Sequence, residues 1–219
     1  MGGRFLWVSA IFFMVIIQGC ASGEKKSDNM SQADRARMYI EVANGCLLEA
    51  DPTGAIQNLT EAQKIDRNLP ELHHSFALAY FAKHDLKTAI DYAKKAVELR
   101  PDYAAANNTL GKLLMDDGRL SEAVAPLERA ANDPLSREAY KAWTNLGIIQ
   151  YKLGAFEPSS KMMDRAVQES PSLACVAYYY RGHIKLRNNQ VKGAIEDYDR
   201  ATRRLCANFG DAYLALGIA

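Results

Sequence analysis

The sequence has few cysteines, no excess of charge and little that points to a catalytic centre. Of its 219 residues only four are cysteine, too few for a small fold held together mainly by disulfides. The formal net charge is +1, and Arg4 is the only charged residue before position 20, so the rest of the chain is neutral. A neutral chain is a poor partner for nucleic acid or for anionic lipid headgroups. Because 48% of the residues are hydrophobic, a disordered chain is excluded as well.

Residues able to form a catalytic or metal site are sparse. The four histidines are His73, His74, His84 and His183, and no HExxH, Walker A, GxSxG or CxxC motif occurs. Neighbouring side chains on a helix, such as His73 and His74, point about 100° apart and chelate a metal poorly. We interpret all four histidines as surface or groove residues. We expect no enzyme activity, cofactor, metal or small-molecule substrate, with an unrecognised hydrolase as the alternative.

The amino terminus has the layout of a secretion signal. Arg4 precedes an uncharged apolar stretch of thirteen residues, from Phe5 to Ile17. As a helix this stretch would reach about 20 Å, which is less than the roughly 30 Å hydrocarbon core of a bilayer. We therefore interpret residues 1–19 as a signal peptide rather than a membrane span.

The end of this segment, Ile17-Gln18-Gly19-Cys20, resembles the lipobox of bacterial lipoproteins. The resemblance implies that Cys20 is diacylated on its sulfur, becomes the new amino terminus and is acylated there again. Several acyl chains anchor a protein stably, whereas one holds only marginally. An ordinary cleaved signal with an incidental cysteine is the alternative. An aspartate directly after the lipidated cysteine resembles a signal that retains lipoproteins in the inner membrane. Ala21 stands at this position here, so we expect an outer-membrane lipoprotein that faces the periplasm.

The polar, unperiodic residues 20–35 are expected to form a flexible tether behind the lipid. Near its end, Ser31 and Asp34 have the spacing of a capping box that starts the first helix.

Small residues recur along the remaining chain in a fixed register. Steps of 34 to 36 residues separate the members of three series, which are Ala43, Ala77, Gly111, Gly147, Gly182 and Gly217; Ala55, Ala89, Ala123, Ser159 and Ala194; and Ala62, Ala96, Ala130, Ala166 and Ala201. Small side chains at such positions allow two helices to cross closely. Turn signals lie between the predicted helices, among them Asp51–Gly54 and Leu153-Gly154. Two units end at a proline, Pro101 and Pro171, because proline does not continue a helix.

This pattern resembles the tetratricopeptide repeat, a helix-turn-helix unit of 34 residues with small residues at these offsets. The resemblance covers residues 36–219. It implies an all-α, right-handed superhelix whose concave face is lined by the first helix of each unit. We predict units at 36–69, 70–103, 104–139, 140–174 and 175–209, followed by a helix at 210–219 that is a cap or half of a sixth unit.

Two cysteines stand at the two ends of the fifth unit. Cys175 opens its first helix and Cys206 follows its second, and these ends are adjacent in an antiparallel helical hairpin. Because a periplasmic location permits oxidation, we predict a Cys175–Cys206 disulfide, with two reduced thiols as the alternative. Cys46 is predicted to be a small buried residue.

The concave face is the predicted binding site, and its apolar and aromatic side chains with amide rims suit an extended or helical peptide. Helical spacing directs toward it Leu78, Phe81, Met115, Ile148, Tyr151, Tyr179 and Tyr180, together with the polar residues Asn108, Lys112 and Asn145. His183, Asn44 and Arg187 are further candidates. The alternative is that some of these residues belong to the core between units.

Residues 116–147 are similar to the type IV pilus biogenesis lipoproteins of the PilF/PilW/Tgl group. In these proteins a two-residue lengthening with an Asn-x-Pro-Leu-like turn precedes an Ala-Tyr/Trp-x-Asn-x-Gly helix. Here the turn is Asn132–Leu135, and it falls in the 36-residue step between Gly111 and Gly147. The Cys175/Cys206 pair is similar to the Tgl-like branch.

The resemblance implies a pilotin, a lipoprotein that binds secretin subunits and helps them assemble in the outer membrane for type IV pilus biogenesis. Another envelope scaffold is the alternative, serving peptidoglycan enzymes or outer-membrane barrel assembly.

Overall fold

The computed structural model describes residues 30–219, and the regular elements in that range are all helical. The predicted signal peptide and Cys20 lie outside the described residues. The helices are α1 (Gln32–Leu48), α2 (Pro52–Ile65), α3 (Pro70–Ala82), α4 (Leu86–Leu99), α5 (Ala104–Asp116), α6 (Leu120–Ala131), α7 (Ala139–Lys152), α8 (Phe156–Glu169), α9 (Cys175–Arg187), α10 (Val191–Arg200) and α11 (Gly210–Ile218), with a 3₁₀ helix at Arg204–Cys206.

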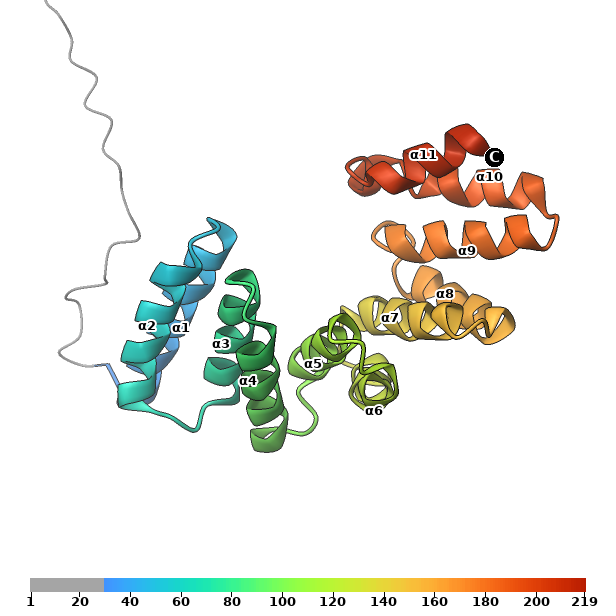
Figure 1. Ribbon diagram of the computed structural model, residues 1–219. Helices are drawn as coiled ribbons and strands as arrows, with labels where there is room; N and C mark the ends of the chain where they lie inside the picture. The colour runs from blue at the N-terminus through green and yellow to red at the C-terminus, as the bar shows by residue number, and fades with distance from the viewer. Residues whose placement is uncertain (1–29) are drawn as a thin grey trace, which may run out of the picture.

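Consecutive helices pair into hairpins, which follow one another along an arc from α1/α2 at one end to α9/α10 at the other (Figure 1). These five hairpins occupy the five predicted units, and α11 packs on α10 as the single helix after them. The prediction of an all-α tetratricopeptide-type superhelix is therefore confirmed.

Two predicted boundaries differ from the structure at the amino-terminal unit. The helix α1 begins at Gln32, so residues 32–35 belong to the repeat domain rather than to the tether. The hydroxyl of Ser31 accepts a hydrogen bond from the backbone N–H of Asp34 at 3.1 Å and thereby caps the helix. Pro52 to Gly54 form the first turn of α2 instead of a connection, because Asp51 caps that helix and proline is favoured at its first position.

The register of small residues marks where the two helices of a hairpin touch. A methyl group placed on Gly111 would lie 2.3 Å from Cγ of Leu127 in α6, and one on Gly182 would lie 2.5 Å from the Tyr198 ring in α10. Gly147 has the same relation to Met163. Large side chains of each second helix thus fill the space that glycine leaves on the first helix.

The fifth unit has its own cross-links. The sulfurs of Cys175 and Cys206 are 2.00 Å apart in a disulfide that joins the start of α9 to the 3₁₀ helix. Arg181 in α9 forms a bidentate ion pair with the fully buried Asp197 of α10, with N···O distances of 2.6 and 2.7 Å, and a third bond to Asp164 of α8. Lys185 also pairs with Asp197 at 2.7 Å, so each of the two buried charges has more than one partner of opposite sign.

The glycine register makes a stability prediction. Gly45 and Gly111 both lie inside helices, but a methyl group on Gly45 meets nothing within 4 Å, whereas one on Gly111 collides with Leu127. Gly45→Ala should raise the free energy of unfolding by up to about 1 kcal/mol through helix propensity. Gly111→Ala should lower it by about 1–3 kcal/mol through overpacking. Urea denaturation measures both, and equal effects of the two substitutions would contradict this role of the register.

The disulfide makes a second prediction. It closes a loop with a sequence separation of 31 residues. Cys206→Ser should lower the free energy of unfolding by about 3–4 kcal/mol if loss of chain entropy in the unfolded state dominates. Mass mapping without reductant should recover the Cys175 and Cys206 peptides linked, and the buried Cys46 should be the free thiol among residues 30–219. Free thiols at both positions would contradict the pairing.

Candidate functional site

The first helices of the units (α1, α3, α5, α7 and α9) lie beside one another and form a continuous face. Two cavities open on this face. The first groove cavity, of about 610 Å³, lies between α1 and α3 and is lined by Ile40, Asn44, Leu47, Leu48, His74, Leu78 and neighbouring polar residues. The second groove cavity, of about 330 Å³, lies between α5, α7 and α9. Ligand sites typically have volumes of about 300–1,000 Å³, so both can hold side chains of a bound segment.

Polar side chains link neighbouring first helices along this face. Ser75 in α3 donates a hydrogen bond to Asn44 in α1 at 2.8 Å. Both ring nitrogens of His74 are occupied, Nε2 by the hydroxyl of Thr109 at 2.9 Å and Nδ1 by the hydroxyl of Tyr103 at 3.3 Å. These contacts use up the hydrogen-bonding capacity of the histidine and fix α3 against α5.

The second groove cavity combines an apolar floor with an amide rim. Its floor contains Ile148, Leu173, Ala174 and Val176, together with the ring of Tyr140. On its rim, the Asn145 side chain in α7 donates a hydrogen bond to Oδ1 of Asn108 in α5 at 3.2 Å.

An aromatic cluster covers the first helices of the last units. The ring of Tyr180 contacts that of Tyr151 with a centroid separation of 5.0 Å, and Tyr179 contacts both Tyr180 and His183. Tyr179 also packs on Phe209, which directly precedes α11. Burial raises the pKa of Tyr179 and of Tyr180 and lowers that of His183, so these groups are uncharged at neutral pH.

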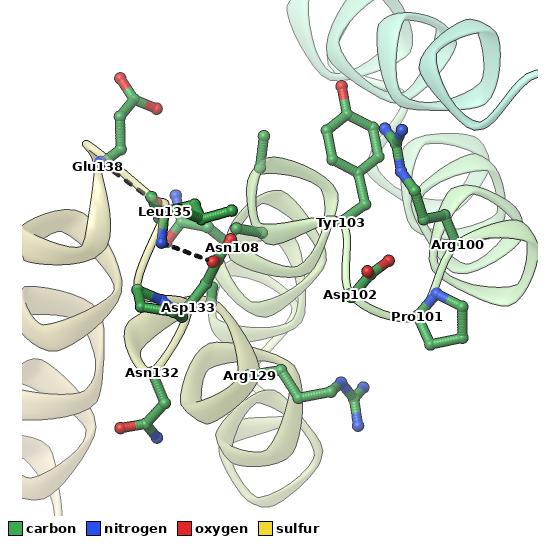
Figure 2. Close-up of a pocket in the computed structure, with 15 residues that line it drawn as sticks. Arg100, Pro101, Asp102, Tyr103, Asn108, Arg129, Asn132, Asp133, Leu135 and Glu138 are labelled. Carbon is green, nitrogen blue, oxygen red and sulfur yellow. Dashed lines mark hydrogen bonds between the residues drawn. The ribbon is translucent and has the colours of Figure 1, made fainter.

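A further cavity, of about 820 Å³, lies at the edge of the superhelix, where the lengthened turn joins α6 to α7. We call it the edge cavity. It opens between Arg100 and Tyr103 on one side and the turn carrying Leu135 and Glu138 on the other (Figure 2). The side chain of Leu135 is 89% exposed beside it, and Asn108 lines both this cavity and the second groove cavity.

Five of the predicted groove residues line the two groove cavities. Leu78 lines the first groove cavity, and Asn108, Lys112, Asn145 and Ile148 line the second. The ring of Phe81 is 42% exposed and lies near Lys112.

Tyr151, Tyr179 and Tyr180 come together in the aromatic cluster with His183. Asn44 lines the first groove cavity. The guanidinium of Arg187 lies over the ring of Phe156, and this ring in turn makes a T-shaped contact with Tyr151.

Two of these expectations are wrong. Met115 is 7% exposed and belongs to the central core rather than to the groove. It lies one helical turn after Gly111, so its side chain leaves α5 on nearly the same side as the glycine that packs on α6. His73 is not a surface or groove residue, because it is buried, stacks on Tyr92 and bonds the carbonyl of Arg67 through Nε2.

The sequence reasoning did not find His74, Tyr103 and Thr109 as a connected set, nor Tyr140, Thr144 and Val176 as lining residues. Ile40, His74, Asn108 and Thr144 share one register position, three residues before the first small-residue series, and this signal could have identified His74 and Thr144. The edge cavity has no counterpart in the repeat pattern, because it arises from the irregular turn.

Across residues 30–219 no cluster of three or more histidine, cysteine or acidic side chains has the arrangement needed to hold a metal ion.

None of the helices in the described part of the chain combines the length and apolar character that crossing a bilayer requires.

The linkage of α3 to α5 through His74 makes a pH prediction. Burial and the nearby Arg100 lower the pKa of His74 from 6.5 to about 4, against weaker opposite effects of Glu138 and Glu71. Below pH 6.5 the unfolded chain therefore binds a proton that the folded chain excludes, and stability should fall as the pH is lowered from about 6.5 to 4.

The melting temperature of His74→Gln should fall less than that of the wild type between pH 7.5 and 5. The exposed His84→Gln serves as control. A wild-type pH profile in His74→Gln would contradict the prediction.

Comparison with known proteins agrees with this architecture. A tetratricopeptide-repeat family profile matches residues 80–142. The type IV pilus assembly protein PilF of Pseudomonas aeruginosa is 25% identical over 196 residues, which cover 87% of this chain and 71% of PilF.

Solved structures show the same fold. A structure of P. aeruginosa PilF superposes with a TM-score of 0.75 at 17% identity, covering 85% of this chain and 89% of that one. The structure of PilW, a widely conserved type IV pilus biogenesis factor, gives a TM-score of 0.73 at 22% identity and covers 82% of each chain. With five helical hairpins, a repeat profile that matches residues 80–142 and similarity to PilF over most of its length, this chain has the tetratricopeptide-repeat fold and is similar to PilF in sequence and structure.

Proposed function

We propose that this protein is a lipid-anchored pilotin, which binds secretin subunits in its concave groove and promotes their assembly in the outer membrane for type IV pilus biogenesis. The observation that carries the proposal is the similarity to PilF over 87% of the chain, which includes the units that form the groove. Tetratricopeptide repeats are scaffolds that bind other proteins, so no reaction is required of this one.

The groove has the chemistry of a protein-binding surface. The first groove cavity presents Leu48, which is 90% exposed, beside Leu78, and Phe81 is exposed on the same helix as Leu78. Exposed apolar side chains in a concave surface are favourable only when a partner covers them. A segment of the secretin is the partner we propose.

The membrane location rests on residues 17–20, which resemble a lipobox. In the proposed function, acylation of Cys20 holds the groove close to the bilayer that the secretin must enter. A tether raises the effective concentration of the bound subunit at that membrane without any additional contact. Outer-membrane attachment is thus part of the proposal.

Secretin multimers in the bacterium that encodes this chain provide the test. Deleting the gene should reduce heat-resistant secretin multimers on gels, and the wild-type gene should restore them. Cys20→Ala should move the protein to the soluble periplasmic fraction and restore multimers poorly. Normal multimer levels in the deletion strain would contradict the proposed function.

A groove variant separates binding from anchoring. Leu78→Glu combined with Phe81→Glu places two charges where we propose that apolar contacts form, and should abolish restoration while the protein stays in the membrane fraction. Leu153→Glu is the matched control, because Leu153 is 64% exposed in the turn after α7, away from the groove cavities. Equal restoration by both variants would count against the groove.

A further inference from the structure

We propose that α11 pairs with α11 of a second copy of this chain in an antiparallel, two-fold symmetric contact, in which Leu214 of each copy fills the space beside Gly217 of the other. The contact uses none of the residues that line the two groove cavities or the edge cavity. It therefore goes beyond the proposed function and does not depend on it.

The first observation is an unfilled position in the register of small residues. Gly217 in α11 belongs to the series in which glycine receives a large side chain of the second helix, as Gly111 receives Leu127 and Gly182 receives Tyr198. A methyl group on Gly217 would meet nothing within 4 Å. Figure 1 shows α11 at the end of the arc, beside α10. In sequence α11 is thus a first helix, and no second helix among residues 30–219 packs on its glycine.

The second observation is an apolar outer face. Tyr213, Leu214, Gly217 and Ile218 share one side of α11, because residues one turn apart lie above one another on a helix. We call these four residues the α11 stripe. Tyr213, Leu214 and Ile218 are 50%, 67% and 76% exposed, whereas Tyr178, at the register position of Tyr213 in α9, is 4% exposed. The terminal unit of a repeat array needs a polar outer face to stay soluble alone, so this face requires a partner.

The apolar surface continues onto the neighbouring helix α10. Ile195 is 39% exposed, whereas Ile90, at the same register position in α4, is 3% exposed in the central core. Val191, one turn before Ile195, is 43% exposed. With the α11 stripe these residues offer about 450 Å² per copy, so two copies would bury about 900 Å², close to the lower limit of about 1,000 Å² for a specific interface. We therefore expect a weak dimer that forms at high local concentration.

The occupant follows from the order of residues in the stripe, which is complementary to itself. Leu214 and Gly217 lie three residues apart, so an antiparallel pair of α11 helices can place Leu214 of each copy opposite Gly217 of the other. This pairing reproduces the contact of Leu127 with Gly111 inside the third unit. Two-fold symmetry forms the contact twice.

The same register places Ile218 of each copy opposite Tyr213 of the other. The Tyr213 hydroxyl donates a hydrogen bond to the carbonyl oxygen of Thr202 at 2.9 Å. This bond fixes the half-exposed ring, which then offers a flat surface to an aliphatic side chain. A single register thus satisfies every member of the stripe.

The charge of α11 favours a second copy over a lipid bilayer as the occupant. Asp211 is the only charged side chain in the helix Gly210–Ile218, and it is not part of the stripe. Two copies therefore bring no charged side chain into the contact, and the dipoles of antiparallel helices attract each other. A helix that lies on a membrane typically has lysine or arginine on its polar face, and α11 has neither.

Filling the space beside Gly217 tests the contact. The purified full chain in density-matched detergent micelles should show a concentration-dependent monomer–dimer equilibrium in sedimentation experiments. Gly217→Leu should raise the dissociation constant of the dimer at least about tenfold, because the added side chain occupies the space that Leu214 of the second copy needs. Gly45→Leu is the matched control, since Gly45 is also helical and an added methyl meets nothing within 4 Å. Circular dichroism melts of both variants check that they are folded.

Two charged variants test the antiparallel register. Leu214→Glu and Gly217→Lys should each weaken self-association, because each places an unpaired charge in the contact. Mixed together, the two variants should form a heterodimer. At one end of this contact the new carboxylate faces the new ammonium group, and at the other end the wild-type pairing of leucine with glycine remains. Sedimentation of the mixture with one variant fluorescently labelled measures the heterodimer.

A full chain that stays monomeric at every concentration would overturn the inference, and so would dimers that Gly217→Leu leaves unchanged. Absence of a heterodimer in the mixture of charged variants would rule out the antiparallel pairing. Protection of α11 from hydrogen exchange by phospholipid vesicles, in a chain that remains monomeric, would assign the stripe to a membrane instead. Secretin multimers test the proposed function separately, since the α11 stripe shares no residue with the groove cavities.

Discussion

The close crossing of two helices within each unit is the contact on which the rest of the molecule depends. Gly111, Gly147 and Gly182 accept Leu127, Met163 and Tyr198 at distances that no Cβ would permit. This contact fixes the distance and rotation of the second helix against the first. The opposite side of the first helix is then free to face the groove. The binding surface is thus a consequence of where the small residues stand.

This dependence explains which features the sequence could reveal. Side chains required by close packing repeat in a fixed register, so the five units and the positions of Leu78 and Ile148 in the walls of the groove cavities followed from spacing alone. Met115 shows where spacing is insufficient, because it has the same register position as the exposed Phe81 but is buried. Whether such a residue reaches the surface depends on its size and on the units around it, which a single unit does not specify.

Contacts between units were harder to predict for a related reason. His74 bonds Thr109 from the next unit and Tyr103 just before that unit begins, and Asn145 bonds Asn108 across a lengthened step. Such pairs are specific to one interface and do not repeat, so periodicity gives no sign of them. The cysteines of the fifth unit are an exception, since the ends of one hairpin are adjacent whatever the neighbouring units are, and the structure joins them. Local geometry was therefore predictable, whereas the chemistry of each interface was not.

The chemistry of each interface, which differs from unit to unit, also affects how the groove would act. A regular superhelix presents equivalent positions from every unit, but the polar links on this face differ, with His74 engaged at both ring nitrogens and Asn145 bonded to Asn108. In the proposed function this difference gives each step of the groove its own contacts with a secretin segment. A strand that awaits its place in a sheet has unpaired N–H and C=O groups that favour premature association. Covering a few of them weakly suffices when a lipid anchor keeps the complex at the membrane, and weak contacts also allow the strand to leave once its proper neighbour is available.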